Sequence, residues 1–208
     1  MTEWRILLLG GTTASGKSTS AWKLARQLGI GCVSADSLWK GVIAITTRET
    51  HPVLHQWPRM DEAPGEPGPL AELHIKEALT MMPALDAFID SELLERNHII
   101  FHGAWLTPEL AAHKCAASDR IRAVFIDEPR TEDILESIVA RSRVAEPSER
   151  QRTMAEVARL YGNWLRSEAT RHGVPLVPAR PRETLANRIL ESAEPVGAGF
   201  KPAQQRHA

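Results

Sequence analysis

The sequence predicts an α/β domain that is built on a parallel β-sheet. Short apolar runs alternate with helical patterns along the chain, which is typical of repeated strand–helix–strand units. The first run, Arg5–Leu9, is apolar on both faces, as expected of a strand buried between two layers of helices. A glycine-rich segment follows it at once and opens an amphipathic helix.

The remaining elements follow in order along the chain. The apolar runs predict strands at Arg5–Leu9, Gly31–Ser34, His98–His102, Ile121–Ile126 and Pro175–Val177. Helical spacing predicts helices at Ser18–Leu28, Ser37–Thr47, Leu70–Arg96, Pro108–Cys115, Glu132–Arg143, Glu149–His172 and Thr184–Glu194. Pro83 predicts a break or kink in the third of these helices. The proline-rich segment His55–Pro69 is expected to form a surface loop.

Composition excludes several classes of protein. The 208 residues carry a formal net charge of −1, so no overall electrostatic attraction to nucleic acid or to an anionic membrane is expected. No apolar stretch is long enough for a membrane span or a signal segment, and a cytoplasmic location is the expectation. Cys32 and Cys115 form no metal or disulfide pattern and are expected to be buried free thiols. The oligomeric state stays open.

The segment Gly11–Thr19 carries the strongest chemical signal. It reads GTTASGKST and matches the pattern GxxxxGK[ST] at every fixed position, between a strand and a helix. Glycines let successive backbone N–H groups turn toward a phosphate, and the helix that follows points its positive end at the same anion. The set Gly11, Thr12, Thr13, Ala14, Ser15, Gly16, Lys17, Ser18 and Thr19 is therefore predicted to bind a nucleoside triphosphate. Lys17 would contact its phosphates and Ser18 would ligate Mg²⁺.

Asp36 follows the second predicted strand, at the sheet edge where ligands of parallel sheets bind. It could hold Mg²⁺ or accept the proton of a substrate hydroxyl. The alternative is that Asp36 only caps the helix that begins at Ser37. Further along, Arg141 lies at the end of a predicted helix before a short break, where it could close over a transferring phosphoryl group or merely complement the helix dipole.

Several segments together resemble the small-molecule P-loop kinases, and the 2-phosphoglycerate kinase group in particular. They are ILLLGGTTASGKST, the Leu24–Asp36 region, HIIFHGAWLTP, VFIDEPRTEDILESIVARSR and Pro178–Thr184. The resemblance implies a three-layer α/β/α P-loop fold with a five-stranded sheet of order 2-3-1-4-5. We expect one kinase-like domain over residues 1–194, with an acceptor region at 48–97 and a lid at 141–152. The tail at 195–208 is expected to be flexible, because its residues show no periodicity. The resemblance also implies that Arg180 and Thr184 lie in the turn that packs against the adenine base.

The implied activity is transfer of the γ-phosphate of MgATP to a small acceptor that is anionic, like 2-phosphoglycerate, with Lys17, Asp36 and Arg141 as catalytic residues. One departure from the resembled pattern concerns the third strand, which ends in His102 where those kinases have an acidic residue. A neutral imidazole binds Mg²⁺ poorly. Asp36 would then carry the metal with Ser18, or activity is altered. A nucleotide-binding regulatory protein without catalysis is therefore an alternative.

Asp127 and Glu128 support a second alternative, a nucleotide hydrolase, because an apolar strand that ends in Asp-Glu resembles the metal site of ATPases. The acceptor pocket is less defined by the sequence. Arg48 and Arg59 would suit an anionic acceptor. Trp105 could line the pocket, whereas Trp22, Trp39 and Trp164 are expected to be packing residues. The choice between ATP and GTP stays open.

Overall fold

A computed structural model describes residues 4–58, 62–142 and 146–193. Its centre is one five-stranded sheet of order β2-β3-β1-β4-β5, in which all neighbouring strands are parallel. The strands are β1 (Ile6–Gly11), β2 (Gly31–Ser34), β3 (Ile99–His102), β4 (Ile121–Asp127) and β5 (Leu176–Pro178). The predicted fold class and strand order are both confirmed.

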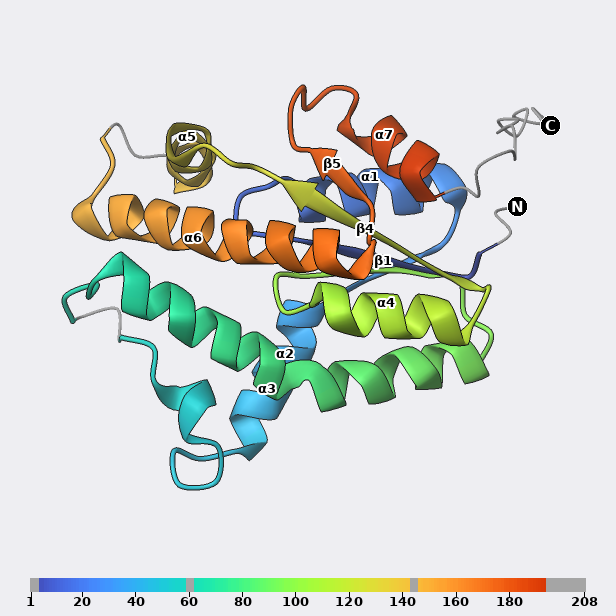
Figure 1. Cartoon of the computed structure of the whole chain (residues 1–208), viewed down its shortest axis with the longest axis horizontal. Helices are drawn as coiled ribbons and strands as arrows, with labels where there is room; N and C mark the ends of the chain where they lie inside the picture. The colour runs from blue at the N-terminus through green and yellow to red at the C-terminus, as the bar shows by residue number, and fades with distance from the viewer. Residues whose placement is uncertain (1–3, 59–61, 143–145, 194–208) are drawn as a thin grey trace.

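Two apolar cores cover the two faces of this sheet, because residues along each buried strand alternate between the faces. In β1, Leu7 and Leu9 face the core that contains α1 (Lys17–Leu28) and α7 (Leu185–Ala193). Ile6 and Leu8 face the opposite core. That core is closed by three helices, α3 (Pro67–Leu94), α4 (Pro108–Ala117) and α6 (Glu149–His172), together with α2 (Ala35–Ile45) at its edge. Figure 1 shows α1 and α7 on one side of the strands and α3, α4 and α6 on the other.

Most predicted elements form within a few residues of their predicted bounds, and α3 has a bend, one of the two outcomes predicted from Pro83. Pro83 lies inside this helix, which continues from Pro67 to Leu94 without a break. The helix changes direction about halfway along, as Figure 1 shows, so the proline is accommodated as a bend. The loop predicted at His55–Pro69 is shorter than expected, because a 3₁₀ turn, η1 (Pro52–His55), precedes it and α3 begins at Pro67.

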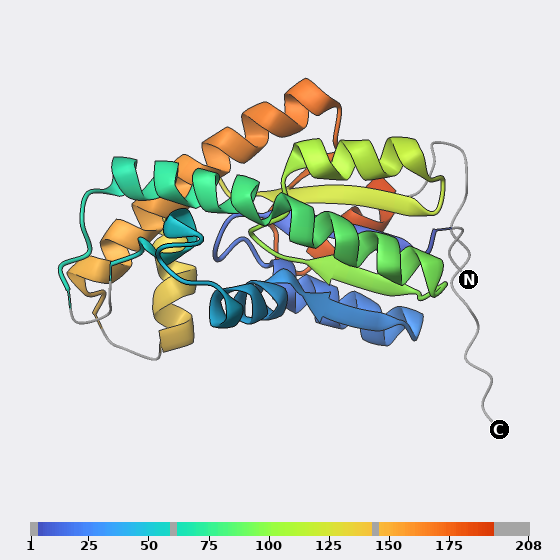
Figure 2. The ribbon, with the colours of Figure 1, turned by 90° about the horizontal axis from the view of Figure 1, so that it is seen from below.

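The predicted lid, residues 141–152, includes the end of α5 (Thr131–Ser142) and the start of α6, and these two helices pack against each other. Figure 2 shows α5 beside the N-terminal half of α6, at the end of the molecule where α3 begins. Residues 143–145 of the lid, and the tail at 195–208, lie outside the described residues. Among the described helices, none combines the length and the apolar character that a membrane crossing needs.

The carboxyl ends of the central strands meet at one edge of the sheet. Leu9 of β1 and Ser34 of β2 both pair with His102 of β3, and Gly11 pairs with Ile126 of β4. The segments that follow these strands therefore emerge side by side, which is where open parallel sheets bind ligands.

Candidate active site

The glycine-rich segment forms a tight loop that only glycine-compatible backbone angles allow. Gly11 and Gly16 have φ values of 137° and 95°, in the region that side chains with a Cβ rarely adopt. A Cβ on Gly16 would lie 2.5 Å from a guanidinium nitrogen of Arg182, and one on Gly11 would lie 2.6 Å from the carbonyl oxygen of Ile126. Backbone conformation thus favours glycine at both positions, and the contact with a backbone oxygen adds a second reason at Gly11.

The N-terminus of α1 provides unpaired donors for an anion. Gly16 is its N-cap and supplies no side-chain acceptor, and the first turn contains no acidic residue. The first backbone N–H groups of the helix therefore remain available, together with the positive end of the helix dipole. These groups fit the phosphates of a nucleotide, as the sequence predicted.

Lys17 lies in this loop with its side chain buried. Its Nζ donates a hydrogen bond of 2.6 Å to the carbonyl oxygen of Thr12. The pKa of Lys17 is lowered to about 8, mainly by burial; the charge of Asp36 raises it, and the charges of Arg141 and Arg182 lower it. The ammonium group is therefore still mostly charged at neutral pH, but it lacks the hydration that an exposed lysine has.

A cavity of about 770 Å³ opens beside this loop and gathers most of the predicted residues. Lys17, Ser18, Asp36, Trp105 and Arg141 all line it. The other predicted loop residues that line it are Thr13, Ala14, Gly16 and Thr19. Gly11, Thr12 and Ser15 do not line the cavity. The Thr12 hydroxyl donates a 2.6 Å hydrogen bond to the Ala158 carbonyl oxygen, which connects the loop to α6.

Asp36 lies in the first turn of α2 and does not cap it. The cap is Ser34, whose hydroxyl accepts a hydrogen bond from the Asp36 backbone N–H at 3.2 Å. The capping interpretation of Asp36 is therefore wrong, and its exposed carboxylate is left facing the cavity. Ser18 and Asp36 provide oxygen ligands of the kind that Mg²⁺ prefers. Within the described residues, no group of three or more His, Cys, Asp or Glu side chains could form a separate metal site. A site with few protein ligands fits Mg²⁺, which keeps waters and substrate phosphates in its coordination shell.

His102 ends β3 beside this edge and lines the cavity while only 4% exposed. Burial lowers its pKa, and the positive charge of Lys17 lowers it further against the opposing effect of Asp36. The side chain is thus a neutral imidazole at neutral pH. It stands at the position where the resembled kinases are expected to carry an acidic residue. The neighbouring Gly103 is needed for packing, because a Cβ there would lie 2.4 Å from the Cβ of Ala35.

Asp127 and Glu128, the acids of the hydrolase alternative, are held by arginines. Arg166 binds both carboxylate oxygens of Asp127, at 2.9 and 2.7 Å. Glu128 is buried and accepts from Arg182 at 3.1 Å, and Arg180 lies 3.3 Å away. Neither acid lines the cavity. This arrangement favours Asp36 as the metal-binding acid.

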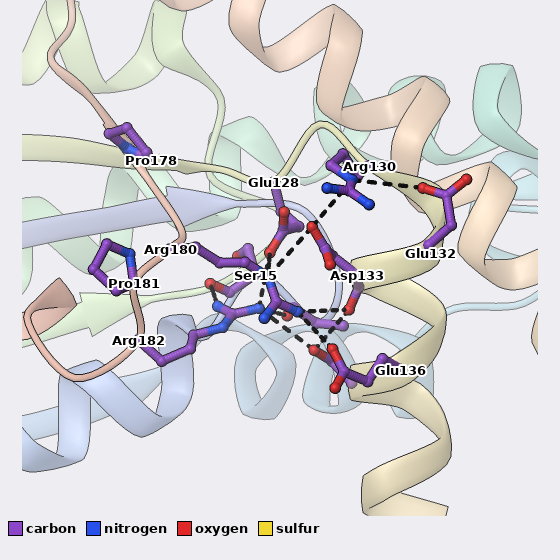
Figure 3. Close-up of polar contacts among 12 residues, drawn as sticks. Ser15, Glu128, Arg130, Glu132, Asp133, Glu136, Pro178, Arg180, Pro181 and Arg182 are labelled. Atoms are coloured by element: carbon purple, nitrogen blue, oxygen red, sulfur yellow. Dashed lines mark hydrogen bonds and ion pairs between the residues drawn. The ribbon is translucent and has the colours of Figure 1, made fainter.

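The turn between β5 and α7 meets the cavity through residues other than Arg180 and Thr184, the two that the resemblance named. Arg180 and Thr184 do not line the cavity, whereas Arg182 and Leu185 do. Arg180 instead contacts Glu128, Asp133 and Glu136. Figure 3 shows both arginines reaching from this turn toward the start of α5.

Arg182 connects this turn to the phosphate loop. Its guanidinium donates to the carbonyl oxygens of Ser15 and of Ala14, the latter at 2.9 Å, while also binding Glu128. One side chain therefore orients the loop, and we assign Arg182 a positioning role that the sequence motif did not reveal. The motif contains no signal for it, because the contact joins residues 167 positions apart.

Part of the remaining cavity wall is aromatic. Trp39 from α2, Trp57 from the segment after η1, His74 from α3 and Trp105 all line it. Trp39 was expected to be only a packing residue, whereas it both packs against the core and lines the cavity. Trp22 was also expected to pack, and it is 56% exposed on α1.

Of the two predicted acceptor arginines, Arg48 does not line this wall. Arg48 is exposed and donates a 2.9 Å hydrogen bond to the carbonyl oxygen of His55, away from the cavity. Arg59 lies outside the described residues. Cys32 and Cys115 are free thiols, as predicted, although both are only partly buried.

Comparison with known proteins supports the resemblance that the sequence motifs indicated. The chain is 22% identical over 183 residues to a protein named 2-phosphoglycerate kinase from Methanococcus maripaludis, and 25% identical over 180 residues to its namesake from Methanocaldococcus jannaschii. Each match covers 83% of this chain, but only 58% and 57% of the relatives, so the chain spans little more than half of their length. No family model matches the sequence.

Solved structures show the same fold. Shikimate kinase from Aquifex aeolicus is similar with a TM-score of 0.50 and 21% identity, over 90% of this chain and 95% of that one. Shikimate kinase from Acinetobacter baumannii, solved with shikimate, also gives 0.50 with 16% identity, over 91% and 92%. The chain is therefore similar to P-loop small-molecule kinases in both sequence and fold.

Proposed function

We propose that this chain is a phosphotransferase that moves the γ-phosphoryl group of ATP to a hydroxyl group of a small molecule. The observation that carries the proposal is the convergence of Lys17, Asp36 and Arg141 on one cavity. These residues come from three separate elements, α1, α2 and α5. The cavity has room for more than the phosphates, because it continues past His102 to the aromatic wall.

Each of these residues has its own role in the proposed reaction. The backbone N–H groups at the start of α1 and the ammonium group of Lys17 bind the phosphates. Ser18 and Asp36 would hold Mg²⁺, which neutralises charge on the phosphates when it is bound. Asp36 also accepts the proton of the attacking hydroxyl, a role that contributes about 10²- to 10⁴-fold in rate. A bond forms between the hydroxyl oxygen and the γ-phosphorus, the bond to ADP breaks, and ADP leaves.

Arg141 lies at the exposed C-terminal end of α5, on the rim of the cavity. A guanidinium group there can stabilise the negative charge that spreads over the transferring phosphoryl oxygens. The rim position suits a group that approaches after the nucleotide has bound. Closure of this kind also excludes water, which competes with the acceptor.

The test is acceptor-dependent release of ADP, measured over a panel of hydroxyl compounds that includes 2-phosphoglycerate. We expect release that depends on an acceptor and on Mg²⁺ and that disappears in Lys17→Ala. Equal ADP release with and without every acceptor would identify a hydrolase instead. Tight binding of MgATP with no release at all would identify a regulatory protein.

A further inference from the structure

The part of the cavity wall that α2 contributes carries an acidic and a basic side chain on one helical face. Asp36, Trp39 and Lys40 all line the cavity. Residues three and four positions apart are neighbours on a helix surface, with about 5–6 Å between their Cβ atoms. One small molecule in the cavity can therefore contact Asp36 and Lys40 at the same time.

Two contacts fix which side of α2 faces the cavity. The ring of Trp39 stacks on that of Trp105, with centroids 5.4 Å apart and planes at 9°. At the start of the helix, Ala35 lies close against Gly103, where an added Cβ would be 2.4 Å from the Cβ of Ala35. Both partners belong to the segment that follows β3, so α2 is tied to the carboxyl edge of the sheet.

The strand order separates this face from the turn that carries Arg182. The phosphate loop follows β1 at the centre of the sheet, α2 follows β2 at one edge, and the Arg182 turn follows β5 at the other edge. Lys40 therefore lies on the β2 side of the phosphate loop, together with Asp36. Because Asp36 is the residue proposed to take the proton of the attacking hydroxyl, the acceptor lies on this side.

The described residues that line the cavity carry more positive than negative charge. The cations are Lys17, Lys40, Arg141 and Arg182, whereas the acid among them is Asp36. Burial lowers the pKa of both lining histidines, so neither adds charge at neutral pH. A cavity with this balance of charge attracts anions.

Three of these cations are already engaged near the phosphates. Lys17 and Arg182 donate to carbonyl oxygens of the phosphate loop at 2.6 and 2.9 Å, and Arg141 is the residue proposed to contact the transferring phosphoryl group. Lys40 differs from them. Its side chain is exposed, and within the part of the chain that the structure describes it forms no hydrogen bond or ion pair. Its ammonium group can bind an anion without first breaking a contact.

We infer that Lys40 binds an anionic group of the acceptor, a carboxylate or a phosphate, while the hydroxyl that attacks ATP lies at Asp36. This inference rests on the proposed phosphotransferase function and names the residue that selects its acceptor. The sequence predicted Arg48 for such a role, but that side chain does not line the cavity. A hydrogen bond between an ammonium group and an anion contributes about 10-fold or more in affinity.

Matched acceptors that differ in one group test the class of acceptor. The three-carbon set is glycerol, glycerate, glycerol 3-phosphate and 2-phosphoglycerate, and the six-carbon set is sorbitol, gluconate and sorbitol 6-phosphate. ADP release by the full chain with ATP and Mg²⁺ is followed by a coupled assay, and products are identified by ³¹P NMR. We expect an acid of one set to exceed its uncharged member in kcat/KM by about 10-fold or more. The carboxylate and phosphate members then tell the two kinds of anion apart.

Variants of Lys40 test the residue. Lys40→Gln removes the charge and should raise KM for the acid about 10-fold while the Kd for ATP changes less than about 2-fold. Lys40→Glu should raise KM further, whereas Lys40→Arg keeps the charge and should restore most of the affinity. Lys23→Gln, at an exposed lysine of α1 that does not line this cavity, is the matched control and should leave KM unchanged.

The outcomes separate the two proposals. If the uncharged members react as efficiently as the acids, the acceptor inference is overturned and the phosphotransferase proposal stands. If ATP binds but no acceptor raises ADP release, the phosphotransferase proposal fails and this inference falls with it. If an acid is preferred but Lys40→Gln leaves its KM unchanged, or Lys40→Arg is as impaired as Lys40→Gln, the charge of Lys40 does not select the acceptor.

Discussion

The Nζ of Lys17 donates a 2.6 Å hydrogen bond to the Thr12 carbonyl oxygen, five residues earlier in the same loop. The lysine that is expected to contact the phosphates is thus held within the loop by a backbone oxygen. A bound phosphate would compete with this oxygen for the ammonium group. The charge state of Lys17 therefore controls how strongly the loop binds a nucleotide.

This control predicts a pH dependence for ATP binding. Only the protonated ammonium group attracts the phosphates, and the pKa of Lys17 is lowered to about 8. Affinity should therefore be full near pH 7 and fall as the pH rises through 8, by about 10-fold per unit well above the pKa. Isothermal titration calorimetry from pH 7 to 9.5 measures it. Lys17→Arg, which stays charged, should bind with no such slope, and the same slope in that variant would assign it to another group.

Asp36, which follows β2, and Asp127, which ends β4, predict opposite outcomes for the same substitution, aspartate to asparagine. Asp36→Asn should lower kcat by about 10²- to 10⁴-fold while the fold remains stable, because the carboxylate faces the cavity. Asp127→Asn should leave turnover within a few-fold and cost about 1 kcal/mol of stability, because it weakens the ion pair with Arg166. Steady-state kinetics and urea unfolding measure the two effects. A reversed result would restore Asp127 as the metal-binding acid.

Arg182 and Arg180 form a second matched pair. Arg182→Ala removes donors from the carbonyl oxygens of Ser15 and Ala14 and one partner from buried Glu128. We expect a loss of about 2 kcal/mol in the free energy of unfolding and weaker binding of ATP. Arg180 is more exposed, with 40% of its side chain accessible, so Arg180→Ala should cost less than about 1 kcal/mol. Urea unfolding would contradict this if Arg180→Ala proved the more costly.

Glu77 predicts an unusual dependence of stability on pH. Its pKa is raised from 4.5 to about 8 by burial, so the folded state holds a proton that the unfolded state releases above 4.5. The contribution of this group to stability is full below pH 4.5, declines as the pH rises and is lost by about pH 8, at up to about 1.4 kcal/mol per pH unit. Below pH 6.5 the opposite effect of His74, whose pKa is lowered to about 3, offsets this decline.

The window from pH 6.5 to 8 therefore isolates Glu77. Glu77→Gln keeps an oxygen that can accept from the Trp57 indole N–H and has no carboxyl proton to lose. This variant should gain stability relative to the natural chain across the window, as measured by urea unfolding at several pH values. Parallel curves for the two proteins would show that Glu77 titrates normally in the fold.

The phosphate loop could be predicted from sequence because its chemistry is local. The spacing between Gly11 and Thr19 determines which backbone N–H groups turn inward, and the adjoining helix begins within the same nine residues. The alternation of apolar runs and helical patterns likewise predicted the elements themselves, within a few residues of their observed bounds. The strand order came from the family resemblance, since periodicity along the chain says nothing about which strands pair.

What the tertiary structure alone decided is the environment around that loop. Arg182, and not Arg180, reaches the carbonyl oxygens of the loop, although the two lie two residues apart in the same turn. Trp39, Trp57, His74 and Trp105 share no motif, and they become one surface only because α2, α3 and the segments after η1 and β3 pack around the carboxyl edge of the sheet. Local sequence specifies backbone conformation, whereas a pocket wall depends on contacts between distant segments. The sequence by itself thus determined the backbone of the loop that we propose binds phosphates, and the packing of the helices decided what lies opposite it.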